Sequence, residues 1–200
     1  MSSSVEKPTH HGKPKHFVRP ARLEDICVLL EPTRKEEIER LRQRQIALQT
    51  SFGGNPIEQI HLTCQRFDCR DEHKIQKFQI ALRDALVDIK PISMTALSLQ
   101  TLYSQIRQTN ILKWSIKVTW EVRQFVALVE RTLVAVGIEP LYTTGFVASL
   151  ITALKDVRAV DDDQLAGVGG FPHHLFTGEQ VELSRICGHN EFETLAIIPM

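Results

Sequence analysis

The sequence lacks a net charge, a paired-cysteine motif and a long apolar run. Lys and Arg together number 24, as do Asp and Glu, so no overall field attracts nucleic acid. The four cysteines form no Cys-x-x-Cys pair, which favours free thiols in a reducing cytosol over a disulfide framework or a zinc site. No uninterrupted apolar run reaches the roughly 18 residues of a membrane span. We therefore expect a cytoplasmic protein without a membrane segment.

The amino-terminal segment differs in composition from the rest of the chain. Residues 1 to 22 are rich in Ser, Pro, Lys and His and carry almost no apolar side chains. They contain no apolar core of a secretory signal, and they offer little burial to offset the entropy of ordering. We expect a disordered polar tail here and a single domain over residues 23 to 200, where a sequence of 42% hydrophobic residues permits a sizeable core.

The first part of that domain predicts a strand, a helix and a second strand. Residues 26–30 are continuously apolar, as in a buried strand. Thr33 and Glu36 have the spacing of a capping box, which predicts a helix from there to about Leu48. The Gly-Gly-Asn-Pro turn at residues 53–56 then leads toward a strand that carries His61.

His61, Leu62 and Thr63 are the most informative residues of the sequence. In a strand, positions two apart point to the same face, so His61 and Thr63 present an imidazole and a hydroxyl side by side while Leu62 is buried. This pair suits a phosphate, because the imidazole transfers protons and the hydroxyl binds a non-bridging oxygen. The alternative, a half-buried strand histidine bonded to the backbone, remains open for His61 taken alone.

The remaining patterns alternate helices and strands. A helix capped by Asp71 is expected to about residue 88, and a second helix is expected over residues 121–136, ended by Gly137. Strands are expected over residues 92–103, 112–119 and 146–152. Helix and strand units that recur in both halves with short connections favour an α+β fold with antiparallel sheets.

The order of strand, capped helix, turn and His-x-Thr resembles the first half of the 2H phosphoesterase superfamily, which includes 2′-5′ RNA ligase-like and cyclic phosphodiesterase-like proteins. The resemblance covers about residues 24 to 200, and residues 176–183 and 192–199 look like the family's last two strands. It implies two pseudo-symmetric lobes of antiparallel sheet flanked by helices, with a central cleft between two His-x-Thr/Ser motifs. It implies further that His61 is a catalytic acid or base and that Thr63 and Thr152 bind the phosphoryl oxygens.

The second motif departs from the family pattern. When Thr152 is placed on the motif hydroxyl, Leu150 takes the position of the second histidine. Two functions follow as alternatives. The first is a 2H-type enzyme acting on RNA 2′,3′-cyclic phosphate or 2′-5′ phosphodiester ends, with activity impaired by the missing histidine. The second is an inactive protein that binds a nucleotide or RNA 3′ end. We expect a monomer, no cofactor and no metal in either case.

Residues 158–176 form the longest segment without a regular pattern. Three consecutive aspartates at 161–163 could bind a hard cation, although such a run is more often a solvated loop. The glycines of residues 167–170 lack the Lys-Ser/Thr of a phosphate-binding loop, so a flexible loop is expected. His173 or His174 could fold over the cleft and replace the missing histidine. An exposed pair of loop histidines is the alternative.

Overall fold

Eight strands and four helices alternate along the chain in the computed structural model, which describes residues 21–104, 108–142, 149–188 and 191–200. Residues 1–20 of the expected tail lie outside the described residues, and so does the segment 143–148, which includes the first three residues of the strand expected over residues 146–152. All strand pairs are antiparallel.

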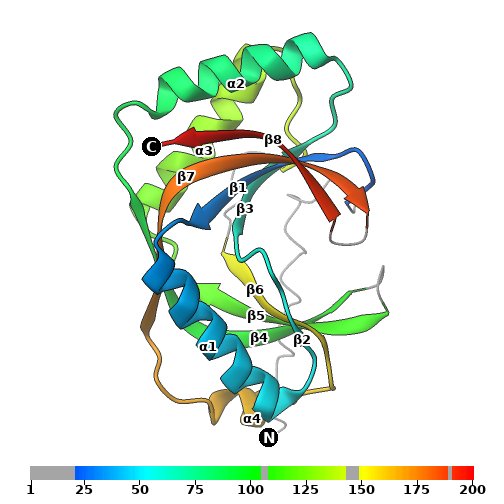
Figure 1. Cartoon of the computed structure of the whole chain (residues 1–200), viewed down its shortest axis with the longest axis vertical. Coiled ribbons are helices and arrows are strands. Elements are labelled where there is room, and N and C mark those ends of the chain that lie inside the picture. The colour runs from blue at the N-terminus through cyan, green and yellow to red at the C-terminus, as the bar shows by residue number, and fades with distance from the viewer. Residues whose placement is uncertain (1–20, 105–107, 143–148, 189–190) are drawn as a thin grey trace, which may run out of the picture.

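The strands form two half-sheets that share one long strand (Figure 1). The first half-sheet has the order β3 (Leu62–Phe67), β1 (Ile26–Pro32), the second part of β7 (His173–Gly188) and β8 (Glu191–Pro199). The second half-sheet has the order of the first part of β7, β4 (Ile92–Ser104), β5 (Thr109–Ile116), β6 (Leu150–Val157) and the short β2 (Asn55–Pro56).

Strand β7 changes partner at Gly178, which pairs with Ile92 of β4 and with Pro32 of β1. A side chain here would collide with that of Leu30, because a Cβ added at Gly178 would lie 2.7 Å from Leu30 Cδ1. The glycine therefore allows one strand to pass from one half-sheet into the other.

In each half-sheet, the helix that connects two of its strands packs on the other half-sheet. The strands β1 and β3 lie in the first half-sheet, but α1 (Lys35–Phe52), which connects them, packs on β6 of the second. The strands β5 and β6 lie in the second half-sheet, but their connecting helix α3 (Trp120–Ala135) packs on β3 of the first. Helix α2 (Glu72–Leu86) lies beside α3 and β8 (Figure 1). The predicted α+β architecture with two similar halves is confirmed.

Two predicted helix boundaries are confirmed in atomic detail. The Asp71 carboxylate accepts hydrogen bonds from the backbone N–H groups of His73 and Lys74, so it caps α2. Helix α3 ends in a Schellman motif, in which Gly137 has a φ of +74° and the Ile138 N–H donates to Leu133 O at 3.0 Å.

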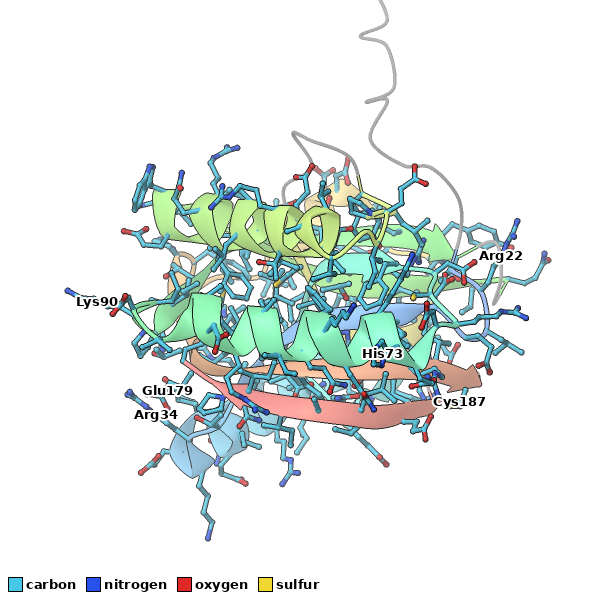
Figure 2. The ribbon with its side chains drawn as sticks, turned by 90° about the horizontal axis from the view of Figure 1, so that it is seen from above. Arg22, Arg34, His73, Lys90, Glu179 and Cys187 are labelled. Carbon is cyan, nitrogen blue, oxygen red and sulfur yellow. The ribbon has the colours of Figure 1, made fainter. Side chains whose placement is uncertain are left out.

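The predicted capping box of α1 is wrong. The N-cap is Arg34, which makes no side-chain cap bond. Thr33 instead donates its hydroxyl to the Glu179 carboxylate at 2.8 Å, and Arg34 pairs with the same carboxylate (Figure 2). Because Glu179 belongs to β7, these contacts fasten the start of α1 to the shared strand rather than closing its first turn.

The prediction that residues 158–176 lack regular structure is also partly wrong. It contains α4 (Asp162–Ala166), and β7 already begins at His173. Asp161 accepts a hydrogen bond from the Gln164 N–H at 2.7 Å while Gln164 Oε1 accepts from the Asp161 N–H, a capping box. The aspartates thus begin a helix. Among the residues described, no cluster of three or more His, Cys, Asp or Glu side chains could hold a metal ion.

Candidate active site

The two half-sheets also meet at a seam between β3 and β6, where Leu62 pairs with Ile151. His61 lies one residue before β3, and continuing the antiparallel register by one residue in each direction would put His61 opposite Thr152 and Thr63 opposite Leu150. Residues opposite one another on antiparallel strands project from the same face. These four residues, which we call the seam face, are half-buried, whereas Leu62 and Ile151 are buried on the other side. The three site residues predicted from the sequence therefore share one face with Leu150.

The chain leading to His61 is held in place from two directions. Strand β2 pairs with β6, and Gly54 before it has a φ of +81°, where an added Cβ would lie 2.5 Å from Lys155 O. Only glycine fits this turn. From α1, the buried Gln45 amide donates to Ile57 O at 3.1 Å and to Ala153 O at 2.9 Å. One side chain thus ties the helix to both segments that form the seam.

The surroundings of His61 determine its protonation state and its tautomer. Its Nδ1 lies 3.1 Å from Gln59 O, and its ring meets Phe192 edge to face at 6.0 Å between centroids. The pKa of His61 is lowered to about 4, chiefly by burial; the hydrogen bond to the Gln59 carbonyl opposes this, and the charge of Lys113 adds a smaller lowering. The ring is therefore neutral at pH 7. Because Nδ1 must carry the hydrogen that it donates to Gln59, Nε2 retains a lone pair that can accept a proton.

Strand β5 contributes a cation that the sequence analysis missed. Lys113 is the register partner of Thr152, and Ser115 is the partner of Leu150, so both extend the seam face across β6. The signal was present in the alternation of residues 112–116, but sequence alone did not show which strand lies beside Thr152. An ammonium group next to a hydroxyl favours an anionic ligand.

Two carboxyl groups, one from β1 and one from β7, extend the seam face beyond β3. Glu31 and Glu182 are both buried, and Gln59 donates to the former at 2.7 Å and to the latter at 3.3 Å. Glu182 also accepts hydrogen bonds from Ser184 and Thr194. Burial and the neighbouring Glu182 raise the pKa of Glu31 to about 7. The protonated form of Glu31 is thereby favoured close to His61, since Gln59 contacts all three side chains.

The two histidines suggested as replacements lie elsewhere. His174 Nε2 is 2.9 Å from a Glu37 carboxylate oxygen on α1, and His174 Nδ1 is 3.2 Å from Ser93 Oγ. His173 bonds through Nδ1 to Gly170 O, and it lies on the α1 side of the second half-sheet. Neither imidazole reaches the seam face, so His61 is its one histidine among the described residues.

Comparisons with known proteins agree with this arrangement at the level of fold. No protein-family model and no curated protein sequence matches the chain. A solved phosphoesterase superposes with a TM-score of 0.61 at 12% identity, over 90% of this chain and 99% of its own. Escherichia coli LigT with bound 3′-AMP gives 0.60 at 13% identity, over 90% and 99%. A Thermus thermophilus protein gives 0.58 at 17%, over 88% and 97%. The chain has the LigT-type phosphoesterase fold.

Structures of LigT itself have been determined with 3′-AMP, NADP+, ATP and phosphate. With 12–13% identity for the phosphoesterase and the 3′-AMP complex of LigT, the likeness describes the course of the backbone, and the chemistry of the present chain must be argued from its own side chains. None of the helices in its described part is long and apolar enough to cross a membrane.

Proposed function

We propose that this protein binds the phosphoryl group of a nucleotide or RNA 3′ end on the seam face. We further propose that it acts there as a weak 2H-type phosphodiesterase on RNA 2′,3′-cyclic phosphate or 2′-5′ phosphodiester ends. The observation that carries the proposal is the pairing of Leu62 with Ile151, since continuing its register by one residue would bring His61 and Thr152 opposite each other. The LigT-type phosphoesterase fold supports the same assignment.

Each residue has a distinct role in the proposed reaction. The hydroxyls of Thr63 and Thr152 donate to non-bridging phosphoryl oxygens, and Lys113 balances their negative charge. His61 accepts a proton from the attacking water through Nε2, because its lowered pKa leaves the ring neutral at pH 7. The Gln59 carbonyl holds the ring in the tautomer that this step needs.

The second proton transfer has no imidazole to perform it. Leu150 cannot protonate the leaving oxygen, and the proposal assigns this step to solvent. A positioned acid contributes roughly 10²–10⁴-fold, which corresponds to about 3–5 kcal/mol of barrier. Weak turnover is therefore part of the proposal. Leu150 also favours the second candidate function, a protein that binds a nucleotide or RNA end without turning it over.

The decisive experiment measures binding and turnover separately. We expect 3′-AMP to bind in calorimetry, and we expect a Thr63→Val, Thr152→Val double variant to bind at least about tenfold more weakly. Loss of both hydroxyls removes two hydrogen bonds to the phosphate, whereas valine preserves the shape. Absent binding by the wild type, or equal binding by the double variant, contradicts the phosphate site.

Turnover of 2′,3′-cyclic nucleotides is expected to rise about 10–100-fold in Leu150→His, because a second imidazole then lies on the seam face. Leu150→Asn is the matched control, since it is polar but transfers no proton. If Leu150→His leaves turnover absent while 3′-AMP still binds, the binding function is the correct one. Robust wild-type turnover that His61→Ala abolishes would show that the site is not impaired.

A further inference from the structure

A cavity lies on the opposite side of the second half-sheet from the seam face. Its volume is about 260 Å³, and it is bounded by α1, by Trp114 of β5, by residues 168–171 and by the first residue of β7. Trp114 follows Lys113 in the strand, so the two side chains point to opposite faces. The cavity is therefore separate from the proposed phosphate site.

Two polar atoms at this cavity are buried without a partner. Arg44 Nη1 and His173 Nε2 are both shielded from solvent, and neither has a hydrogen-bond partner among the described residues. The other ring nitrogen of His173 lies 3.2 Å from Gly170 O, and the ring stacks on Phe171 at 4.6 Å between centroids. Buried polar atoms are nearly always paired, so two orphans at one cavity point to a missing binding partner.

The charge of the site indicates the chemistry of that partner. Arg44 has no carboxylate partner among the described residues, and burial together with the nearby Arg40 lowers its pKa. A partly buried cation without a counter-ion is stabilised by an anion. The rest of the wall is mainly apolar, with Leu48, Trp114 and Phe171 contributing flat or aliphatic surface.

The loop at the rim leaves room for a ligand. A Cβ added at Gly169 or Gly170 would meet nothing within 4 Å, so open space lies beside this part of the rim. We propose that this cavity binds a small aromatic carboxylate, whose carboxylate bonds to Arg44 and His173 and whose ring packs against Leu48, Trp114 and Phe171.

The position of Trp114 makes the proposal directly measurable. Trp120 is 70% exposed, so a Trp120→Phe background leaves Trp114 as the single fluorescent reporter in the cavity wall. Titration with benzoate is expected to change this fluorescence in a saturable manner. Benzamide, a neutral molecule of the same shape, is expected to bind at least about tenfold more weakly. The absence of a saturable change, or equal binding of benzamide, overturns the proposal.

Two variants test the assigned contacts. Arg44→Met keeps an apolar stem and removes the charge, and it is expected to weaken benzoate binding at least about tenfold. Arg42→Met on the same helix is the matched control, because Arg42 is exposed and does not line the cavity. If both variants bind benzoate as the wild type does, Arg44 is not the carboxylate partner and the proposal fails.

A third variant keeps the proposal testable if Arg44→Met does not fold. His173→Phe retains the stack on Phe171 and removes Nε2, and a several-fold loss of benzoate binding is expected. Unchanged affinity contradicts the role of His173. Inorganic phosphate at the same concentration should compete poorly, because it offers charge without a ring. Effective competition by phosphate would overturn the aromatic part of the proposal.

Discussion

His61 combines partial accessibility to solvent with a lowered pKa. It is partly accessible on the seam face, and its pKa is lowered to about 4 by its surroundings. A ring that stays neutral through most of the physiological range is suited to accept a proton rather than to donate one. The electrostatics therefore favour one of the two roles that the sequence left open.

The lowered pKa predicts a specific sensitivity to acid. The ordinary value is 6.5, so the unfolded chain binds this proton more tightly than the folded one, and stability falls as pH falls from 6.5 to about 4. The loss is expected to be about 1–3 kcal/mol. Urea unfolding at pH 7 and pH 4.5 should show it in the wild type and a smaller loss in His61→Asn. His73→Asn, at an exposed position, should behave as the wild type. Equal pH dependence of His61→Asn and wild type contradicts the prediction.

Glu31 predicts the opposite trend. Its folded pKa of about 7 lies above the ordinary 4.5, so the stability contributed by its protonated form is present below pH 4.5 and is lost as pH rises through 7. Glu31→Gln is therefore expected to stabilise the protein at pH 8 by about 1–3 kcal/mol, with little effect at pH 4.5. The denaturation midpoint at both pH values measures this. Glu36→Gln, an exposed neighbour, should change neither midpoint. A Glu31→Gln protein that is less stable at pH 8 would refute the raised pKa.

At the residue scale, the sequence predicts those site residues that lie within a few positions of one another along the chain. The strand period alone predicts a shared face for His61 and Thr63, although β3 begins only at Leu62. Lys113 and the carboxyl pair were missed because their relevance depends on which strands lie side by side. Strand neighbours far apart in the sequence are set by packing of the whole sheet, which no local pattern records.

At the scale of elements, α1 holds together the two chain segments that form the seam. Gln45 lies fully buried in the helix and satisfies two backbone carbonyls, one before His61 and one in β6. Gln45→Leu has a similar volume but leaves both carbonyls unpaired, which is expected to cost about 1–3 kcal/mol. Thermal unfolding measures the loss. Gln43→Leu, on the exposed side of the same helix, is the control and should leave stability almost unchanged. Equal stability of the two variants would show that Gln45 does not hold the seam.

Most elements followed from periodicity, but the start of α1 and the whole of α4 did not. Thr33 and Glu36 have the spacing of a capping box, yet the Glu179 carboxylate from β7 takes the Thr33 hydroxyl. Helix α4 was missed because a five-residue helix is too short for a periodic apolar pattern, although its Asp161 and Gln164 form a capping box. In the first case a tertiary contact outweighed the local signal, and in the second the local signal had no pattern to support it.

At the scale of the whole molecule, the amino-terminal segment is proposed to be dispensable for folding. Removal of residues 1–20 should change the melting temperature by less than about 2 °C, because these residues carry almost no apolar side chains to bury. Differential scanning calorimetry of the shortened and full chains tests this. A decrease of more than a few degrees would show that the segment packs on the domain.

The shared strand β7 predicts that both half-sheets unfold together. It pairs with β4 before Gly178 and with β1 and β8 after it, so neither half can lose β7 without unpairing strands of the other. The two halves carry separate probes. Trp114 reports on the second half-sheet, and the buried thiols of Cys27 and Cys64 report on the first.

With Trp120→Phe, Cys69→Ser and Cys187→Ser as background, Trp114 fluorescence and thiol labelling should give the same urea midpoint. A single transition is the expected behaviour of a sheet whose parts share a strand. Gly178→Ala is the matched perturbation, because its Cβ collides with Leu30 where β7 changes partner. This variant should lower both midpoints by the same amount. Separate midpoints in the background protein would show that the halves fold independently and that β7 does not couple them.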